Sequence, residues 1–234
     1  MTATQQARRT GYRRIGDGEH SWVYRRPGSR YCVQQFRPDC AELTPDKVRR
    51  EYTYLTVVYA PVPGLIPEQR LFVPRSDAHI SETLLVKRWV EVDTSKPLGR
   101  ISAAHLAPGA MRQMVTFLGI TRNLLASPQV TLLPDIIDDR FQNLAVDTAG
   151  NLRLLDTNRL ISTRALRQLP PGARLDIERR WIHARFLRRL MYLESAFLGR
   201  GRSELRDDWL YRRSLHVTDI DELFARSIGR GETI

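Results

Sequence analysis

The sequence contains few cysteines, and this scarcity excludes whole classes of protein. Cys32 and Cys40 are the only two among 234 residues. Two cysteines cannot build a disulfide framework or a zinc site of the usual kind. Because Cys32 lies inside an apolar strand pattern, we interpret it as a small buried side chain and not as a reactive thiol.

Long apolar runs are also missing. No stretch approaches the about 20 apolar residues that a membrane-spanning helix needs, and the start, MTATQQARRTGYRR, lacks the apolar core of a secretory signal. We therefore expect a cytoplasmic protein without a transmembrane segment. The length of 234 residues and the hydrophobic content of 42% suit one two-lobed domain or two very small ones.

Lysine is scarce, whereas arginine is abundant. Only Lys47, Lys87 and Lys96 are lysines, so 34 of the 37 basic residues are arginines, and the formal net charge is +11. A field this positive favours anionic partners, such as nucleic acid, phospholipid headgroups or phosphorylated glycans, and argues against a cationic substrate. It is also compatible with peripheral contact with a membrane.

The order of the expected elements predicts an α+β protein. Residues 11–36 read as three strands, of which the last two are joined by the turn at residues 26–29. Thr44 and Pro45 begin a helix, and strands are expected around residues 71–73 and 83–92. Later segments read as helices over 108–126, with an apolar stripe that includes Val115, and over 173–198, and the last 30 residues are expected to be helical. Strands first and helices later favour two lobes, which we place at 1–92 and 93–234.

Two motifs carry the candidate chemistry. Gly16 and Gly18 stand in a strand–turn–strand sequence that leaves backbone N–H groups available for phosphates. Downstream, Asp138 and Asn143 precede a hairpin over residues 144–155, and Asp156 follows it. The hairpin brings Asn143 and Asp156 to the same end, where their oxygens suit Mg²⁺, while Asp138 is placed to accept a proton from a hydroxyl.

Taken together, the order and spacing of these residues resemble the protein kinase superfamily, over roughly residues 12–160 and most strongly over 133–160. The resemblance implies a two-lobed kinase-like fold with a small β-rich N-lobe and a helical C-lobe, and the cofactors ATP and Mg²⁺. It places Asp138 at the catalytic aspartate and Asn143 and Asp156 at the two metal ligands. The nucleotide-binding positions that it implies in the first lobe are Gly16, Gly18, Val23, Gln34, Glu51, Lys87 and Trp89.

The sequence departs from the family pattern at the phosphate-binding lysine. Gln34 stands where the strand over residues 31–36 should carry that lysine, and an amide supplies no charge. Glu51 then lacks its usual partner. Lys87 ends the strand Leu84–Val86 at a position facing the nucleotide, and two readings stay open: its ammonium replaces the missing lysine, or it points to solvent.

Two further departures concern regulation. Ile136 and Ile137 replace the usual His-Arg before Asp138, so control by an activation-loop phosphate is not expected. The run Asp156-Thr157-Asn158-Arg159 replaces Asp-Phe-Gly. It is similar to compact bacterial kinases of lipopolysaccharide core sugars and to small kinase-like effectors.

Three functions follow as alternatives. The first is an atypical kinase, a Mg-ATP-dependent phosphotransferase whose hydroxyl acceptor is a sugar of an anionic glycolipid or a protein Ser/Thr. The second is a pseudokinase that binds nucleotide or a protein partner without catalysis, and the third is an RNA-binding protein or an RNA kinase. The arginine-rich helix over 173–198 fits an anion-binding ridge formed by Arg179, Arg180, Arg185, Arg188 and Arg189, or simply a solvated face.

Overall fold

The structure is a computed structural model that describes residues 11–40, 43–73, 79–137, 141–158, 160–163 and 174–212, with the backbone alone over 174–184. Asp138, Arg159 and the C-terminal residues expected to be helical beyond residue 212 lie outside the described residues. The chain divides into two compact units. One comprises Met1–Val57 and Ile66–Glu91, and the other comprises Val58–Leu65 and Val92–Ile234.

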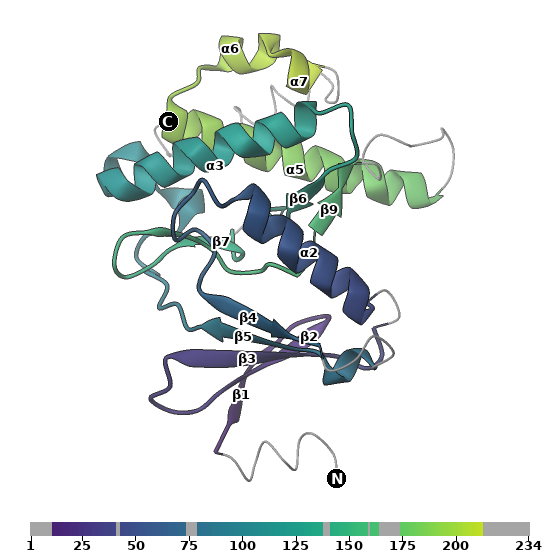
Figure 1. Cartoon of the computed structure of the whole chain (residues 1–234). Coiled ribbons are helices and arrows are strands. Elements are labelled where there is room, and N and C mark those ends of the chain that lie inside the picture. Colours follow the sequence, from purple (N-terminus) through teal and green to yellow (C-terminus); the bar gives the residue numbers. More distant parts are fainter. Residues whose placement is uncertain are drawn as a thin grey trace. The chain divides into compact units, whose positions relative to one another are not determined.

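The first unit is built on one five-stranded antiparallel sheet in the order β1-β2-β3-β5-β4 (Figure 1). Its strands are β1 (Arg13–Asp17), β2 (Ser21–Arg25), β3 (Tyr31–Phe36), β4 (Gln69–Phe72) and β5 (Leu84–Arg88). The helix α2 (Pro45–Val58) comes between β3 and β4, and the short 3₁₀ helix η1 (Ile80–Glu82) precedes β5. All five predicted strand segments are therefore present.

Helix α2 covers one face of this sheet. It starts where Thr44 Oγ1 accepts the N–H of Lys47 at 3.2 Å, which satisfies one of the N–H groups that a helix start leaves open. Its buried positions, Val48, Glu51 and Leu55, recur at helical spacing. Val48 shares a core cluster with Phe36 of β3, so the α2-facing side of the sheet is the side that carries Phe36. We call this side the inner face.

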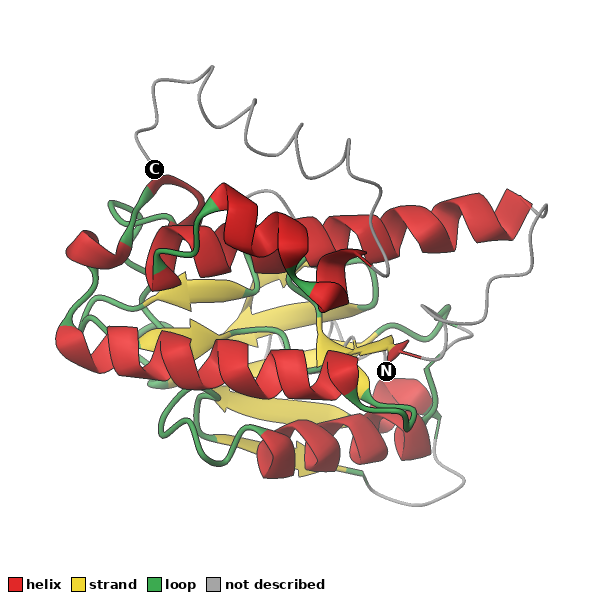
Figure 2. Ribbon diagram, turned by 90° about the horizontal axis from the view of Figure 1, so that it is seen from above, coloured by secondary structure: helices red, strands yellow, loops and turns green. Residues whose placement is uncertain are grey.

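The second unit is mainly helical. Its long helices are α3 (Pro108–Ala126) and α5 (Arg174–Leu198), which pack against each other and are drawn in red in Figure 2. Smaller elements surround them: η2 (Leu98–Arg100), η3 (Ala103–His105), α6 (Arg202–Asp207), α7 (Trp209–Arg212) and the strand pairs β6 (Leu132–Pro134) with β9 (Leu160–Ser162) and β7 (Leu144–Val146) with β8 (Leu152–Leu154). The structure confirms the predicted α+β class, with a β-rich N-terminal part and a helical C-terminal part.

One detail of the predicted helix packing is wrong. Val115 was expected in the apolar stripe of the helix over 108–126, but it is 48% exposed. The buried stripe of α3 consists of Ala110, Met114, Phe117, Leu118 and Thr121. Phe117 stacks on Tyr59 with ring centroids 5.4 Å apart, and Thr121 lies within 2.9 Å of the Tyr59 hydroxyl. The side of α3 that contacts Tyr59 is therefore the buried side. It includes Met114 and Leu118 of the expected stripe, and Val115 lies outside it. Among the described residues, no helix has the length and apolar character needed to cross a membrane.

Candidate functional site

The glycine motif forms the turn of the β1–β2 hairpin, at the end where Asp17 pairs with Trp22. The N–H of Gly18 donates to the carbonyl of Ser21 at 2.9 Å, which closes the turn. The N–H of Arg37 donates to the carbonyl of His20 at 2.9 Å, and the Arg37 guanidinium forms an ion pair with Asp17. Contacts from beyond β3 therefore hold the turn in place.

Gly16 is constrained by packing against the neighbouring strand. The pairing between β1 and β2 shifts register between Arg14 and Gly16, and Gly16 then stands opposite Val23. A Cβ added at Gly16 would lie 3.2 Å from the Val23 Cβ, closer than ordinary contact. The absence of a side chain at Gly16 is thus a requirement of the hairpin itself, whether or not a phosphate also binds there.

Gln34, at the position where the family pattern has lysine, is bonded to the glycine turn. It is 8% exposed and stands opposite Val23 on β2. Its Nε2 donates to Ser21 Oγ at 2.8 Å, and the Ser21 carbonyl is the group that accepts the Gly18 N–H. The Gln34 side chain therefore stabilises the turn through its hydrogen bond to Ser21.

Lys87 lies on the inner face, and this answers the question that the sequence leaves open. Buried residues alternate along β3 as Cys32, Gln34 and Phe36, and along β5 as Leu85 and Lys87. Lys87 is only 9% exposed, so it does not point to solvent. Glu51, which is 5% exposed, is on the buried face of α2.

Trp89, predicted to contact the nucleotide, follows β5 and is half-buried. The Arg25 guanidinium lies over its ring, 4.4 Å from the centroid, and its Nε1 donates to Glu91 Oε1 at 2.8 Å. The N–H of Trp89 donates to the carbonyl of Arg30 at 2.8 Å. A guanidinium stacked on the indole fixes the ring by cation–π attraction.

In the second unit, the β7–β8 hairpin brings Asn143 and Asp156 together. Leu144 pairs with Leu154, and the N–H of Leu155 donates to the carbonyl of Asn143 at 2.7 Å. Asn143 immediately precedes β7, and Asp156 follows β8 after one residue. Both residues therefore stand at the open end of the hairpin, although thirteen positions separate them in sequence.

The local bonds at both residues leave one oxygen of each side chain available for a cation. Asn143 Nδ2 donates to the carbonyl of Asp135 at 3.1 Å, which orients the amide and leaves Oδ1 as its acceptor atom. Asp156 Oδ1 accepts the N–H of Asn158 at 3.0 Å, and Oδ2 accepts no hydrogen bond from a described residue. An amide oxygen and a carboxylate oxygen fit Mg²⁺, which usually takes one or two carboxylates and completes its shell with phosphate and water.

No group of three or more His, Cys, Asp or Glu residues with metal-binding geometry occurs in the part of the chain that the structure describes. Asp135 was missed at the sequence level: it is 6% exposed, and its backbone carbonyl is what orients Asn143. Because the bond from Asn143 reaches the backbone carbonyl of residue 135, the residue type at this position gives no sequence signal for it.

The loop before Asn143 is anchored by buried apolar side chains. Ile136 is fully buried. Phe141 is 2% exposed and has a φ of 50°, an uncommon backbone conformation for a bulky residue. Its ring packs against Tyr192 of α5 at 5.8 Å, and the Arg189 guanidinium lies 5.7 Å from its centroid.

The predicted anion-binding ridge on α5 is only partly open to a test. Arg185, Arg188 and Arg189, which were expected to point mostly outward, are half-buried. The Arg189 guanidinium lies over the Phe141 ring. The side chains of Arg179 and Arg180 lie outside the described residues.

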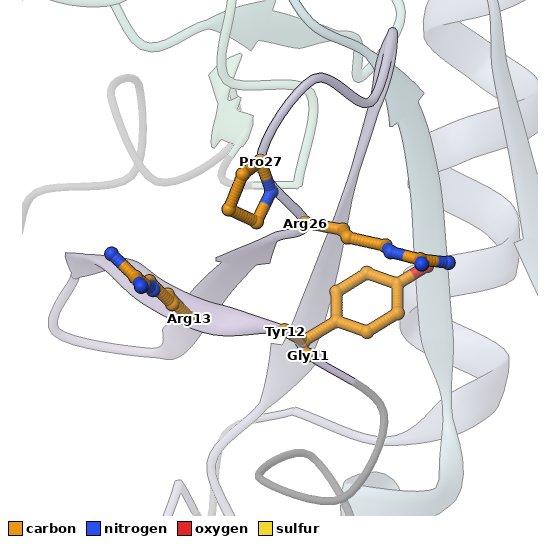
Figure 3. A pocket seen from close by; sticks show the side chains of 5 residues that line it. All are labelled: Gly11, Tyr12, Arg13, Arg26 and Pro27. Atoms are coloured by element: carbon orange, nitrogen blue, oxygen red, sulfur yellow. The ribbon is translucent and has the colours of Figure 1, made fainter.

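A hollow of about 550 Å³ lies at the opposite end of the β1–β2 hairpin from the glycine turn. Gly11, Tyr12, Arg13, Arg26 and Pro27 line it (Figure 3). These residues lie where β1 begins and β2 ends, and none of them is a predicted site residue. The hollow is therefore separate from the glycine motif.

No protein-family model matches this sequence, and a search of curated proteins finds no match. Solved kinase structures do match across most of the chain. The choline kinase LicA from Streptococcus pneumoniae is 13% identical, with 94% of this chain and 97% of that chain covered and a TM-score of 0.38. The granulovirus kinase PK-1 from Cydia pomonella granulovirus is 11% identical, with 95% and 82% covered and a TM-score of 0.42. The kinase WbdD is 14% identical, with 91% and 44% covered and a TM-score of 0.38.

The strands of the N-terminal sheet, the helix between β3 and β4, and the hairpin that follows the Asn143 loop occur in the chain order that the resemblance implied.

Proposed function

We propose that this chain is an atypical kinase, a Mg-ATP-dependent phosphotransferase that acts on a hydroxyl acceptor. One observation carries the proposal: the β7–β8 hairpin holds Asn143 and Asp156 at one end, and no described residue donates a hydrogen bond to Asn143 Oδ1 or Asp156 Oδ2. Sequence places Asp138 five residues before Asn143, on the same connection. The set provides two metal ligands and one base, which phosphoryl transfer requires.

In this proposal each residue has a defined task. Asp138 accepts the proton of the acceptor hydroxyl, whose oxygen forms a bond to the γ-phosphorus as the bond to the β–γ bridging oxygen breaks and ADP leaves. Asn143 and Asp156 would hold a Mg²⁺ ion, which would supply positive charge to neutralise the phosphate oxygens. Gly16 and Gly18 would let the glycine turn lie close to the phosphates because they carry no side chain, and Val23 and Trp89 would contact the base.

The acceptor is proposed to be anionic because the chain carries a formal charge of +11. A sugar of an anionic glycolipid and RNA satisfy this condition, and a protein Ser/Thr satisfies it where acidic residues flank the hydroxyl. The specific observation in favour of a pseudokinase is Gln34, which supplies no charge and is bonded to Ser21. That second candidate predicts nucleotide binding without transfer.

Two measurements test the proposal. Thermal melting with and without Mg-ATP reports nucleotide binding, and transfer of ³²P from labelled ATP into lipid, RNA and protein fractions of a cell extract identifies the acceptor. We expect Asp156→Asn to abolish transfer. The control is Asp207→Asn, which changes an exposed carboxylate on α6 and should keep wild-type transfer.

The outcomes separate the candidates. Stabilisation by Mg-ATP together with Asp156-dependent transfer supports the phosphotransferase. Stabilisation with no transfer into any fraction contradicts it in favour of the pseudokinase. Salt-sensitive RNA binding with neither effect favours the RNA-binding alternative.

A further inference from the structure

The inner face of the first unit gathers polar side chains at a place where a sheet normally buries apolar ones. Gln34, Glu51 and Lys87 are 8%, 5% and 9% exposed. Burial of an ammonium or a carboxylate is costly unless a specific role or partner compensates for it. The three residues come from β3, α2 and β5, so three separate elements each bury one polar side chain in this unit.

The strand register places Lys87 next to Gln34. Cys32 pairs with Lys87 and Gln34 pairs with Leu85, so Gln34 and Lys87 are diagonal neighbours on the same face. Diagonal neighbours in an antiparallel pair lie about 7–8 Å apart, a span that long side chains bridge. The ammonium of Lys87 can therefore serve the region that a lysine at position 34 would serve.

The charge of Lys87 acts on this face. Burial raises the pKa of the Cys32 thiol, and the positive charge of Lys87 opposes that rise. An opposite charge lowers a pKa in this way only when it lies within several ångströms. Cys32 is the cross-strand partner of Lys87, so this effect agrees with the register and places the charge of Lys87 on the inner face.

Lys87 also differs from the other basic residues in side-chain type and burial. Lys87 is one of three lysines among 37 basic residues, and the other two are more exposed. Lys96 has 44% of its side chain exposed and pairs with Asp93 at 3.5 Å, and Lys47 lies in the first turn of α2. Lysine presents a compact charge on a flexible stem, whereas arginine presents a wide planar fork. A narrow buried position that must contact a phosphate oxygen favours lysine.

We propose that Lys87 on β5 is the phosphate-binding cation of this chain, and that Gln34 on β3 supports the glycine turn instead of binding phosphate. This inference rests on the proposed function, because it assigns a residue to the same nucleotide site. Glu51, on the helix face that packs against the inner face, is the carboxylate placed to orient the ammonium. The positive charge then comes from β5, the strand next to β3, instead of from β3 itself.

Affinities for ATP and adenosine, both with Mg²⁺, test the assignment, because only ATP has phosphates. We expect Lys87→Met to weaken ATP binding about 10- to 100-fold, the size of a lost charge-assisted hydrogen bond, and to leave adenosine binding unchanged. Lys96→Met is the matched control and should bind ATP as the wild type does. The double variant Gln34→Lys/Lys87→Met returns the charge to β3 and should recover most of the ATP affinity.

A second measurement needs no variant. Acetylation by an amine-reactive ester, mapped by mass spectrometry, resolves all three lysines in one experiment. We expect Mg-ATP, but not adenosine, to protect Lys87, while labelling of Lys47 and Lys96 stays constant. The acetylation experiment tests whether Lys87 contacts the phosphates even if Lys87→Met fails to fold.

The possible failures are distinguishable. If the wild type binds neither ATP nor adenosine, the proposed function is wrong. If the wild type binds Mg-ATP while Lys87→Met binds it equally well, or while Lys87 is labelled at the same rate with and without Mg-ATP, the site stands and the assignment of Lys87 is wrong.

Discussion

Both units bury charged side chains, but they surround them differently. In the second unit, Glu194 of α5 is fully buried and accepts hydrogen bonds from Arg122 of α3 at 2.9 Å and from Arg200. The same two arginines donate to Asp208 at 2.7 and 2.8 Å. Two carboxylates and two guanidinium groups thus form a closed network that ties α3, α5 and the segment joining α6 to α7.

In the first unit, the buried polar groups lie on a sheet face and on the helix that covers it. Gln34 donates to Ser21 Oγ, and Ser21 closes the glycine turn. Lys87 shares the inner face with Gln34, and Glu51 is on the helix that covers it. Gln34 thus connects this face to the glycine turn, whereas Lys87 stands opposite Cys32, farther from the turn.

The comparison teaches that burial of charge alone does not reveal a functional site. A network that joins helices stabilises the fold, so its loss should appear in unfolding experiments. Loss of a polar side chain from the inner face of the first unit should weaken ligand binding instead. The predictions below test this division, beginning with the largest expected effect.

Glu194→Gln should cause the largest loss of stability. The substitution removes the charge that faces Arg122 and Arg200 and leaves two buried guanidinium groups with one carboxylate fewer. Breaking a buried ion pair by changing one partner costs about 3–5 kcal/mol. Urea unfolding measures this loss in the free energy of unfolding.

The matched control for Glu194→Gln is Glu204→Gln. Glu204 also pairs with Arg200, at 2.6 Å, but 58% of its side chain is exposed. An exposed ion pair contributes about 0–1 kcal/mol. Equal losses for the two variants would contradict the view that burial gives the network its strength. Mg-ATP affinity of the folded protein should stay unchanged in both variants.

Asn143→Leu should affect the metal more than the fold. The variant loses the amide oxygen assigned to Mg²⁺ and the bond from Nδ2 to the Asp135 carbonyl. We expect the Mg²⁺ concentration that supports ATP binding to rise by about tenfold or more, and stability to fall by about 1 kcal/mol. Titration of Mg²⁺ at fixed ATP measures the first effect.

An exposed asparagine provides the control for this substitution. Asn123→Leu on α3 changes the same residue type away from the hairpin and should leave the Mg²⁺ requirement unchanged. An unchanged requirement in Asn143→Leu would exclude Asn143 as a ligand and weaken the proposed function.

Asp208 should make unfolding dependent on pH in the acid range. Burial alone would raise the pKa of Asp208, but the N–H of Leu210 and the guanidinium groups of Arg200 and Arg122 hold the pKa below its ordinary value. Since the folded pKa is the lower one, ionised Asp208 stabilises the fold above the unfolded value of about 3.9. That contribution is lost as the pH falls through the folded pKa.

The measurement for Asp208 is the midpoint of urea unfolding at pH values from about 6 down to about 3, a range that includes the ordinary pKa values of carboxylates. Asp208→Asn should be less stable at pH 6 and lose less stability on acidification than the wild type. Asp207→Asn, an exposed neighbour, should follow the wild-type profile. Parallel profiles for the wild type and Asp208→Asn would exclude this linkage.

The sequence predicted the features that depend on local chemistry. Residues 144–155 place the turn Asp147-Thr148-Ala149-Gly150 between two short segments rich in apolar residues, so the hairpin and the meeting of Asn143 with Asp156 followed without tertiary information. The start of α2 followed from the Thr44-Pro45 pair for the same reason. The chemical roles of these site residues remain predictions.

Features that depend on distant partners could not be predicted. The network of Arg122, Glu194, Arg200 and Asp208 joins residues up to 86 positions apart, and no local pattern marks them. The inward position of Lys87 required the register of β5 against β3. Val115 looked buried because periodicity does not show which side of a helix meets an aromatic partner such as Tyr59.

The smallest expected effect concerns Gly16, and it separates packing from phosphate binding. Gly16→Ala introduces a Cβ 3.2 Å from the Val23 Cβ, and overpacking of this kind costs about 1 kcal/mol. In Gly16→Ala/Val23→Gly the Val23 Cβ and Cγ2 that the new Cβ would meet are both gone, so the two substitutions should destabilise less together than their separate losses add up to. Urea unfolding of the wild type, the two single variants and the double variant measures this coupling. Strict additivity would contradict the close contact between position 16 and Val23.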